Sequence, residues 1–274
     1  MELPRTGAPT ERPVGVFDSG VGGLTVLRAL LAELPHEDFL YLGDTARLPY
    51  GTKSAGTVAR YSVRAAAALV ERDIKALVVA CNTASATALP ALRERFPTLP
   101  VLGVIEPGAR AACEASASGR IAVLATEGTV QGGAYKRAIE ALRPDAQVMQ
   151  IACQIFVALA EEGWSEGTAV DATAERYLAH LDARVDTVVL GCTHFPLLAE
   201  AITRQLGPTR RIVDSAATTA RAAQRTLVTR QLTRGTRGGL LRLLATDSPE
   251  RFARVGARFL GSSIAAKSVE AIDL

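Results

Sequence analysis

The chain has 274 residues, of which 48% are hydrophobic and 22% charged, and its formal net charge is +3. This length allows two modest domains with hydrophobic cores, and so small a net charge does not by itself indicate a nucleic-acid partner. Residues 1–13 lack the apolar segment of a signal peptide, and no run reaches the roughly 18 apolar residues of a membrane span. We therefore expect a cytoplasmic protein whose four cysteines are free thiols, with no membrane and no nucleic-acid partner.

Strand-like and helix-like segments alternate along the chain. Strands are predicted at 14–17, 39–42, 76–80, 101–105, 121–125, 147–152, 185–190, 212–213 and 240–244. Helices are predicted at 24–34, 54–72, 83–96, 109–117, 135–142, 156–162, 170–181, 218–232 and 249–260, with Pro90 as a candidate break and a frayed tail after Gly261. This alternation predicts an α/β fold, and about nine strands favour two similar domains over one compact unit. Each of the two domains would be a mainly parallel sheet flanked by helices, with the active site in the cleft between the domains.

Two cysteines follow predicted strands at equivalent places. Cys81 comes after strand 76–80 and Cys192 after strand 185–190, and each is followed by small polar residues. Ligands of open α/β sheets bind at the carboxyl ends of strands, and a helix N-terminus lowers the pKa of a thiol. We therefore expect each half to bring one acid/base thiol to a shared cleft. Asp18-Ser19 and Asp214-Ser215, each after a strand, are a further short echo between the halves.

Other reactive residues are open to more than one interpretation. His194 could exchange a proton with Cys192, or it could be an ordinary loop residue. A zinc site at these two residues would need a second ligand pair, which the sequence lacks, so no metal is expected. Asp18 could orient a thiol or a substrate ammonium, or it could begin a turn. Cys113 and Cys153 are interpreted as packing residues.

Two stretches could contact phosphate. The glycine-rich loop 18–23 matches neither the dinucleotide nor the P-loop fingerprint. Arginines near the C-terminus could bind phosphates, but a solvated helix face is the simpler interpretation. They stand at positions 221, 225, 230, 234, 237 and 242.

Taken together, the motifs resemble those of the glutamate racemase family over roughly residues 13–261. The stretches that carry the resemblance are 17–24, 43–51, 80–85 and 191–196, with 245–252 and 259–261 near the end. The resemblance implies interconversion of L- and D-glutamate without pyridoxal phosphate, metal or any other cofactor, supplying D-glutamate for peptidoglycan. It also implies a homodimer. The implied domains are 13–107 plus 216–274 and 108–215, after a flexible leader, 1–12.

The resemblance also implies roles for individual residues. Cys81 and Cys192 would be the acid/base catalysts for D- and L-glutamate, assisted by Asp18, His194 and Glu161. Glu162 is an alternative to Glu161, because Cys153-Gln154 stands where the family commonly has Cys-Pro. The implied substrate-binding residues are Asp18, Ser19, Tyr50, Gly51, Asn82, Thr83, Thr193 and His194.

Three alternatives remain on sequence grounds. One is a racemase for aspartate or hydantoins on the same scaffold. Another is a decarboxylase, which the presence of both thiols argues against. The third is a non-catalytic amino-acid-binding or partner-inhibiting protein with the same fold. Besides these, the late arginines could bind nucleic acid.

Overall fold

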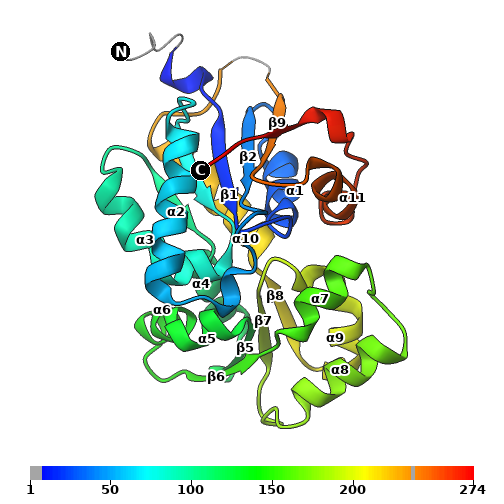
Figure 1. Cartoon of the computed structure of the whole chain (residues 1–274). Coiled ribbons are helices and arrows are strands. Elements are labelled where there is room, and N and C mark those ends of the chain that lie inside the picture. Colours follow the sequence, from blue (N-terminus) through cyan, green and yellow to red (C-terminus); the bar gives the residue numbers. More distant parts are fainter. Residues whose placement is uncertain (1–7, 236–237) are drawn as a thin grey trace.

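The computed structural model describes residues 8–235 and 238–274, within which ten strands form two separate sheets (Figure 1). The strands are β1 (Val14–Asp18), β2 (Phe39–Gly43), β3 (Ala76–Val79), β4 (Val101–Gly103), β5 (Arg120–Ala125), β6 (Gln147–Ala152), β7 (Thr187–Gly191), β8 (Arg211–Asp214), β9 (Leu241–Ala245) and β10 (Val269–Ala271). The α-helices are α1 (Leu24–Glu33), α2 (Ala55–Val70), α3 (Asn82–Arg95), α4 (Ile105–Ala115), α5 (Glu127–Gly132), α6 (Ala134–Leu142), α7 (Ile155–Glu162), α8 (Thr168–Leu178), α9 (Ala199–Leu206), α10 (Ser215–Thr229) and α11 (Pro249–Leu260). Short 3₁₀ helices are η1 (Pro9–Glu11), η2 (Tyr50–Thr52), η3 (Phe195–Leu198) and η4 (Ala266–Ser268).

The two sheets share one strand order. The larger sheet has the order β10-β9-β2-β1-β3-β4 and the smaller one β6-β5-β7-β8, with every neighbouring pair parallel. Matching β1, β2, β3 and β4 to β5, β6, β7 and β8 reproduces the same order in both. The predicted fold class, α/β with two mainly parallel sheets flanked by helices, is confirmed. We call the larger sheet with its helices the first half and the smaller one the second half.

Helices cover both faces of each sheet, which explains the composition of the strands. Every residue of β1, β3 and β7 is buried. Strands buried on both faces are continuous hydrophobic runs instead of alternating polar and apolar residues. In the first half, for example, Val16 and Leu27 share one core cluster while Leu42 and Leu77 share another on the opposite face.

The chain passes twice between the halves. Helix α4 leads from β4 to β5, and α10 leads from β8 back to β9. Strands of the first half lie within residues 14–103 and 241–271, and those of the second within 120–214. The domain boundaries themselves, 13–107 plus 216–274 and 108–215, stay a prediction.

Several predicted elements are corrected by the structure. Strand β4 ends at Gly103 and α4 begins at Ile105, so the predicted strand 101–105 was too long. Pro107 lies in the first turn of α4, where a missing N–H is tolerated. Pro90 does not end α3, which continues to Arg95 because Ala88, Leu89 and Leu92 bury its inner face. Helices α5 and α9 were not predicted, since with 6 and 8 residues each is shorter than the stretch of roughly 11 residues or more over which helical periodicity is recognised.

Both ends of the described chain are more ordered than predicted. The tail after Gly261 is not frayed, because β10 pairs with β9 in register Val269↔Leu243. Residues 8–12 of the predicted leader include η1, and Arg12 pairs with Asp73 at 3.0 Å, whereas residues 1–7 lie outside the described part. Within the described ranges, no helix is long and apolar enough to span a membrane.

Candidate active site

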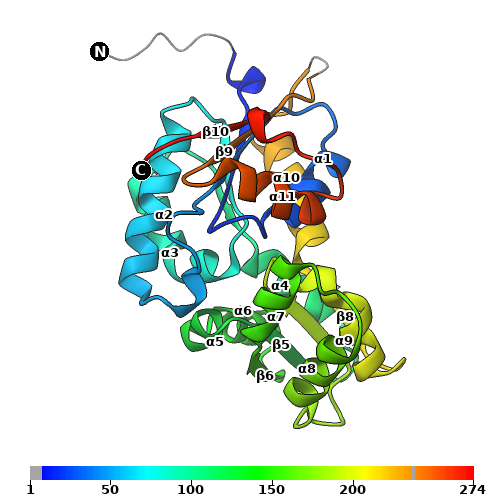
Figure 2. The same ribbon diagram turned by 45° about the vertical axis from the view of Figure 1, so that its right-hand side comes forward.

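Both predicted thiols line one small cavity between the halves, which lie one above the other in Figure 2. The cavity has a volume of about 40 Å³, room for only a few water molecules. Its lining follows the carboxyl ends of strands from both sheets: Ser19, Gly20, Leu48, Pro49, Tyr50, Gly51, Cys81, Asn82, Thr83, Thr126, Gln154, Val157, Glu161, Cys192, Thr193 and His194. Of the predicted site residues, Asp18 alone is absent from this lining.

Strand register places the two cysteines equivalently. Asp18 ends β1, and Ala80 follows β3 beside it, while Ala125 pairs with Gly191 across β5 and β7. Cys81 and Cys192 each come one residue later. The echo between Asp18 and Asp214 is therefore not a structural equivalence, because Asp214 ends β8, which corresponds to β4.

The Cys81 thiol is held by groups of the first half. Its sulfur accepts a hydrogen bond from the backbone N–H of Ala84 at 3.4 Å, as the N-cap of α3. Burial and the Asp18 carboxylate nevertheless raise the pKa of Cys81 to about 12, although hydrogen bonds from Ser19 and Ala84 act in the opposite direction. The helix N-terminus acts in the expected direction through Ala84, but the net lowering that we expected does not occur, because desolvation and the nearby negative charge outweigh the helix.

Asp18 is fully buried and does not itself line the cavity. Its Oδ2 accepts a hydrogen bond from the backbone N–H of Gly20 at 2.9 Å, but its Oδ1 has no partner among the described residues. Burial raises the pKa of this carboxyl group, and the nearby His194 partly offsets the effect. An unpaired buried oxygen of this kind is unfavourable unless a ligand or a moving proton satisfies it.

Cys192 has different neighbours. Its sulfur lies 3.8 Å from Nδ1 of His194, and Nε2 of the same ring lies 3.2 Å from Oε1 of Glu161. Burial lowers the pKa of His194, but the hydrogen bonds to Cys192 and Glu161 outweigh it and raise the pKa to about 10. Burial raises the pKa of Glu161, yet His194 and Arg251 lower it overall. Glu161, and not the exposed Glu162, makes this contact.

A buried aspartate fixes the loop that carries Tyr50. Asp44 accepts hydrogen bonds from the Tyr50 hydroxyl at 2.6 Å, from Arg47 at 2.9 Å and from Thr246 at 2.8 Å. The hydroxyl of Tyr50 therefore points to Asp44, and this contact holds the loop from Leu48 to Gly51 that lines the cavity.

Hydroxyl and amide groups complete the lining. Oδ1 of Asn82 accepts a hydrogen bond from Tyr135 at 2.8 Å, which leaves its buried Nδ2 without a partner among the described residues. Thr83 lies 2.9 Å from Thr126 and 3.2 Å from Thr129, hydroxyl to hydroxyl, so these groups join α3 to the second half. The arrangement offers hydrogen-bond donors and acceptors to a small polar molecule between two thiols.

Some lining residues were missed from the sequence. Thr126 is the first residue after β5, and Gln154 is the second residue after β6. Their position just after a strand was therefore a usable signal. The buried Oε1 of Gln154 has no partner among the described residues. Cys113 and Cys153 do not line the cavity. No group of three His, Cys, Asp or Glu that could hold a metal occurs within residues 8–235 and 238–274.

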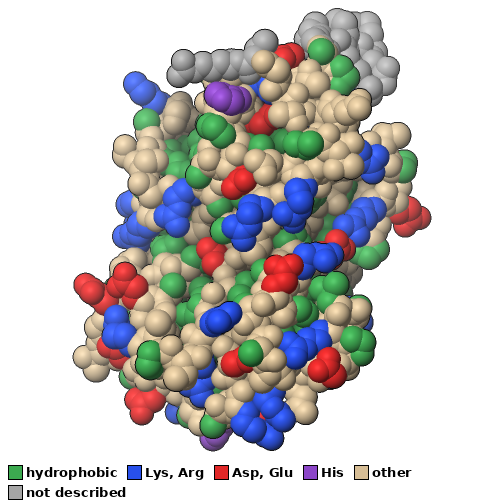
Figure 3. Space-filling view, turned by 180° about the vertical axis from the view of Figure 1, so that it is seen from behind, with side chains coloured by type: hydrophobic (Ala, Val, Ile, Leu, Met, Phe, Trp, Pro, Cys, Tyr) green, Lys and Arg blue, Asp and Glu red, His purple; other side chains and the backbone are tan. Residues whose placement is uncertain are grey.

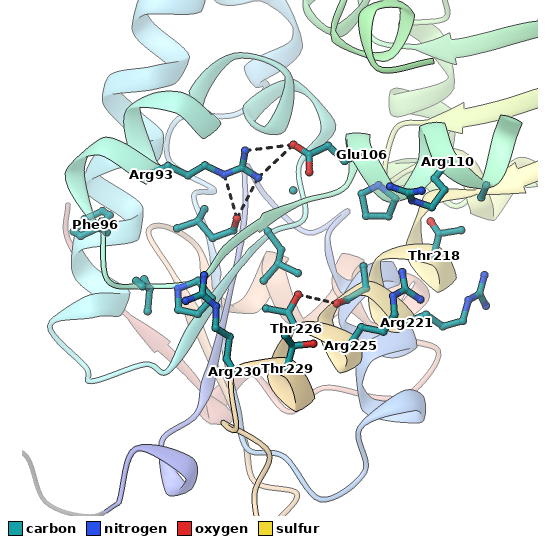
Figure 4. Close-up of a pocket in the computed structure, with 18 of the residues that line it drawn as sticks. Arg93, Phe96, Glu106, Arg110, Thr218, Arg221, Arg225, Thr226, Thr229 and Arg230 are labelled. Atoms are coloured by element: carbon teal, nitrogen blue, oxygen red, sulfur yellow. Dashed lines mark hydrogen bonds and ion pairs between the residues drawn. The ribbon is translucent and has the colours of Figure 1, made fainter. Parts of the chain in front are cut away.

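A second, much wider cleft has a different character. Lys and Arg side chains gather across the middle of the face seen in Figure 3, and Figure 4 shows the cleft at close range. It measures about 930 Å³, shares no residue with the thiol cavity, and is lined by arginines 93, 110, 221, 225 and 230 among others. It contains no cysteine or histidine, so it lacks the groups that the thiol cavity offers for acid/base chemistry.

The late arginines are accordingly divided among several places. Those at 221, 225 and 230 lie exposed on or just after α10 at this cleft. Arg234 pairs with Asp38 and Glu11, and Arg242 pairs with Glu270. Arg237 lies outside the described residues.

Comparison with known proteins gives one consistent result. The profile of the Asp/Glu/Hydantoin racemase family matches residues 19–223. Glutamate racemase of Geobacter metallireducens is 51% identical over 255 residues, which cover 92% of this chain and 94% of that protein. Two crystal structures share the fold. Glutamate racemase isoform RacE1 of Bacillus anthracis has a TM-score of 0.92 at 37% identity and covers 97% of this chain and 98% of its own. Glutamate racemase of Francisella tularensis in complex with D-glutamate has a TM-score of 0.90 at 34% identity. The match covers 96% of this chain and 98% of that one. The chain therefore belongs to the Asp/Glu/hydantoin racemase family.

Proposed function

We propose that this chain is an isomerase that interconverts L- and D-glutamate by proton transfer between two thiols. The observation that carries the proposal is the pair Cys81 and Cys192, which face one buried cavity from equivalent strands of the two halves. Inversion at a carbon atom needs a base on one face and an acid on the other, which this pair supplies. The names of the relatives favour glutamate over aspartate or hydantoins.

The proposed step conserves protons and electrons. With L-glutamate, the Cys192 thiolate removes the α-proton, so the Cα–H bond breaks and its electron pair stays on Cα as an S–H bond forms. The Cys81 thiol then gives its proton to the opposite face of Cα and becomes a thiolate. The reverse sequence converts D-glutamate, with Cys81 as the base. No step requires a cofactor.

Neighbouring groups support each thiol in this proposal. On the Cys192 side, a His194 imidazolium held by Glu161 stabilises the thiolate, because an opposite charge favours the ionised form. On the other side, we assign to Oδ1 of Asp18, which has no partner among the described residues, a hydrogen bond from the Cys81 thiol or the substrate ammonium. A bound ammonium group would also offset the negative charge that raises the pKa of Cys81.

Substrate binding is assigned to the polar lining. We assign contacts with the carboxylate, ammonium and side-chain groups to Ser19, Tyr50, Gly51, Asn82, Thr83, Thr193 and His194, together with the buried Asp18. The unpaired Nδ2 of Asn82 supports this, since it is a buried donor facing an acceptor-rich molecule. Because the cavity of about 40 Å³ is too small for an amino acid, we expect the halves to separate for entry and close for the reaction.

The wider setting is proposed with the reaction. The product D-glutamate would supply peptidoglycan synthesis in the cytoplasm, and the chain would act as a homodimer. Sedimentation equilibrium of the purified chain measures the oligomeric state, and a monomer at assay concentration would refute the dimer.

The first experiment follows α-proton loss and optical rotation in deuterium oxide. The purified chain is incubated with L-glutamate or, in parallel, L-aspartate, without added cofactor. Loss of rotation with deuterium at Cα for glutamate alone is the expected result. Turnover of aspartate alone would keep the mechanism and change the substrate, and no exchange with either would refute the proposed reaction.

A further inference from the structure

Helix α11 belongs to the first half but contacts the second half beside the Cys192 thiol. Its Phe252 and Val255 are buried in the core of the first half. From the same helix, Arg251 Nη2 lies 3.0 Å from Oε2 of Glu161, and Arg258 Nη1 donates to the Glu161 backbone carbonyl at 2.6 Å. The side chain and the main chain of Glu161, at the end of α7, are thus both held by one helix of the other half. Figure 1 shows the positions of α7 and α11 in the two halves.

The contact between Arg251 and Glu161 is connected to the Cys192 thiol through the Glu161 carboxylate and the His194 imidazole. Glu161 uses its other oxygen, Oε1, to face Nε2 of His194, whose Nδ1 faces the Cys192 sulfur. The ring of Phe259, also on α11, packs edge-on against the imidazole with 5.0 Å between centroids. One helix therefore orients both the carboxylate and the imidazole that adjoin Cys192.

No other described side chain bonds Oε2 of Glu161. Without Arg251, this carboxylate could rotate away from His194, because the single remaining contact at Oε1 is 3.2 Å long. Cys81 depends less on the other half, since Ser19, Ala84 and Asp18 belong to its own half and the second half contributes the charge of Cys192.

We propose that Arg251 is a positioning residue that holds Glu161 against His194 across the two halves and so sets proton transfer at Cys192 selectively. Arg258 anchors the end of α7 for the same purpose. Helix α11 thereby completes the surroundings of Cys192 only when the halves meet. The inference rests on the proposed racemisation, but its test separates the two.

The test uses glutamate labelled with deuterium at Cα. The primary isotope effect on kcat/KM is measured for L-[2-²H]glutamate, whose deuteron Cys192 removes, and for the D-isomer, whose deuteron Cys81 removes. In the Arg251→Gln variant we expect kcat/KM to fall about tenfold, because a small misplacement of an assisting group slows transfer. We also expect the isotope effect to rise for the L-isomer and fall for the D-isomer, since the step at Cys192 becomes more rate-limiting in both directions.

Three variants serve as controls. Arg254→Gln changes an exposed arginine of α11 that forms no ion pair with any other described residue, so it should stay within twofold of the wild-type rate. Arg251→Lys keeps the charge and should recover part of the loss. In a Glu161→Gln background, Arg251→Gln should cause no further loss, because Arg251 acts through that carboxylate.

The outcomes are distinct. A wild-type chain that exchanges no α-hydrogen of glutamate refutes the proposed function, and this inference with it. An active wild type, with isotope effects in Arg251→Gln that change equally for both isomers, refutes the positioning role alone. An additive loss in the double variant also refutes it, because Arg251 would then act by another route.

Discussion

Cys81 and Cys192 follow the same point in the strand register of the two halves, yet their surroundings differ. Asp18 ends β1 beside Ala80, while the corresponding residue in the second half is Ala125, which cannot accept a proton or carry charge. The second half instead places His194 two residues after its cysteine, where the first half has Thr83. A matching scaffold thus carries a carboxylate beside one thiol and an imidazole–carboxylate pair beside the other. The lesson is that strand register fixes where a thiol stands, while neighbouring side chains fix its proton affinity.

The largest loss of activity is expected when either thiol is removed. Cys81→Ser and Cys192→Ser should each lower racemisation by on the order of 10³-fold, because general acid/base groups contribute roughly 10² to 10⁴. Polarimetry with L- and D-glutamate measures the rates. Cys113→Ser, outside the cavity, should stay within twofold of wild type. Full activity of either serine variant at position 81 or 192 would end the two-thiol mechanism.

The next test uses the pH dependence of the rate to distinguish the His194–Glu161 pair beside Cys192 from Asp18 beside Cys81. The Glu161→Gln variant loses the negative charge that helps to raise the pKa of His194 to about 10. The alkaline limb of its kcat profile should therefore move to lower pH, whereas Asp18→Asn should leave that limb near its wild-type position. Rates between pH 6 and 11 decide the point, and equal displacement in both variants would contradict a separate role for the imidazole.

The ion pair between His194 and Glu161 should make the free energy of unfolding depend on pH in a defined direction. The pKa of His194 rises on folding from an ordinary 6.5 to about 10. Its contribution to the free energy of unfolding is therefore complete below about pH 6.5 and is lost as the pH rises through about 10. Urea denaturation of wild type and His194→Gln at pH 6, 8 and 10 measures it. The difference between the two proteins should shrink toward pH 10, and a difference that grows would contradict the assignment.

A smaller effect is expected where the backbone of Gly22 lies against side chains of the second half. A Cβ atom at Gly22 would lie 2.4 Å from the Thr193 hydroxyl and 2.5 Å from the imidazole of His194. Gly22→Ala should displace these groups, and an overpacking cost of about 1–3 kcal/mol borne by the closed state lowers the rate roughly 5- to 150-fold. Gly56→Ala, at an exposed glycine with only Arg60 nearby, is the matched control. Unchanged kcat/KM in Gly22→Ala would show that closure tolerates the added methyl.

The smallest effect concerns the hydroxyl cluster that joins α3 to α5. Thr129→Val removes one of three mutually bonded hydroxyls, while Thr83 and Thr126 remain bonded to each other at 2.9 Å. Loss of one such hydrogen bond should lower the free energy of unfolding by about 1 kcal/mol, or about 2–4 °C in Tm. Thermal denaturation checks this, and a tenfold loss of activity would instead place Thr129 in substrate binding.

Much of this arrangement could be predicted from the sequence, because local signals carried it. The alternation of apolar runs and helices predicted the fold class, and both cysteines stood where strands end. Long-range contacts left no such signal. The reach of Arg251 to Glu161 joins residues 90 positions apart, and Thr126 acquires its neighbours only when α3 meets α5. The high pKa of Cys81 was also not predictable, since burial and the distance to Asp18 are properties of the folded chain.

The two passages of the chain between the halves have a consequence for folding. The second sheet is built from one continuous stretch, residues 120–214, whereas β2 pairs with β9 in register Phe39↔Leu241. During synthesis, β2 can pair with β1 early, but its other edge has no partner until β9 has been made, about two hundred residues later. Sequence-distant pairing of this kind is slow, because the loop must close before contacts form. We expect pulse-labelled hydrogen exchange to show β5 and β7 protected before β2, so that the smaller half serves as the folding nucleus for the larger.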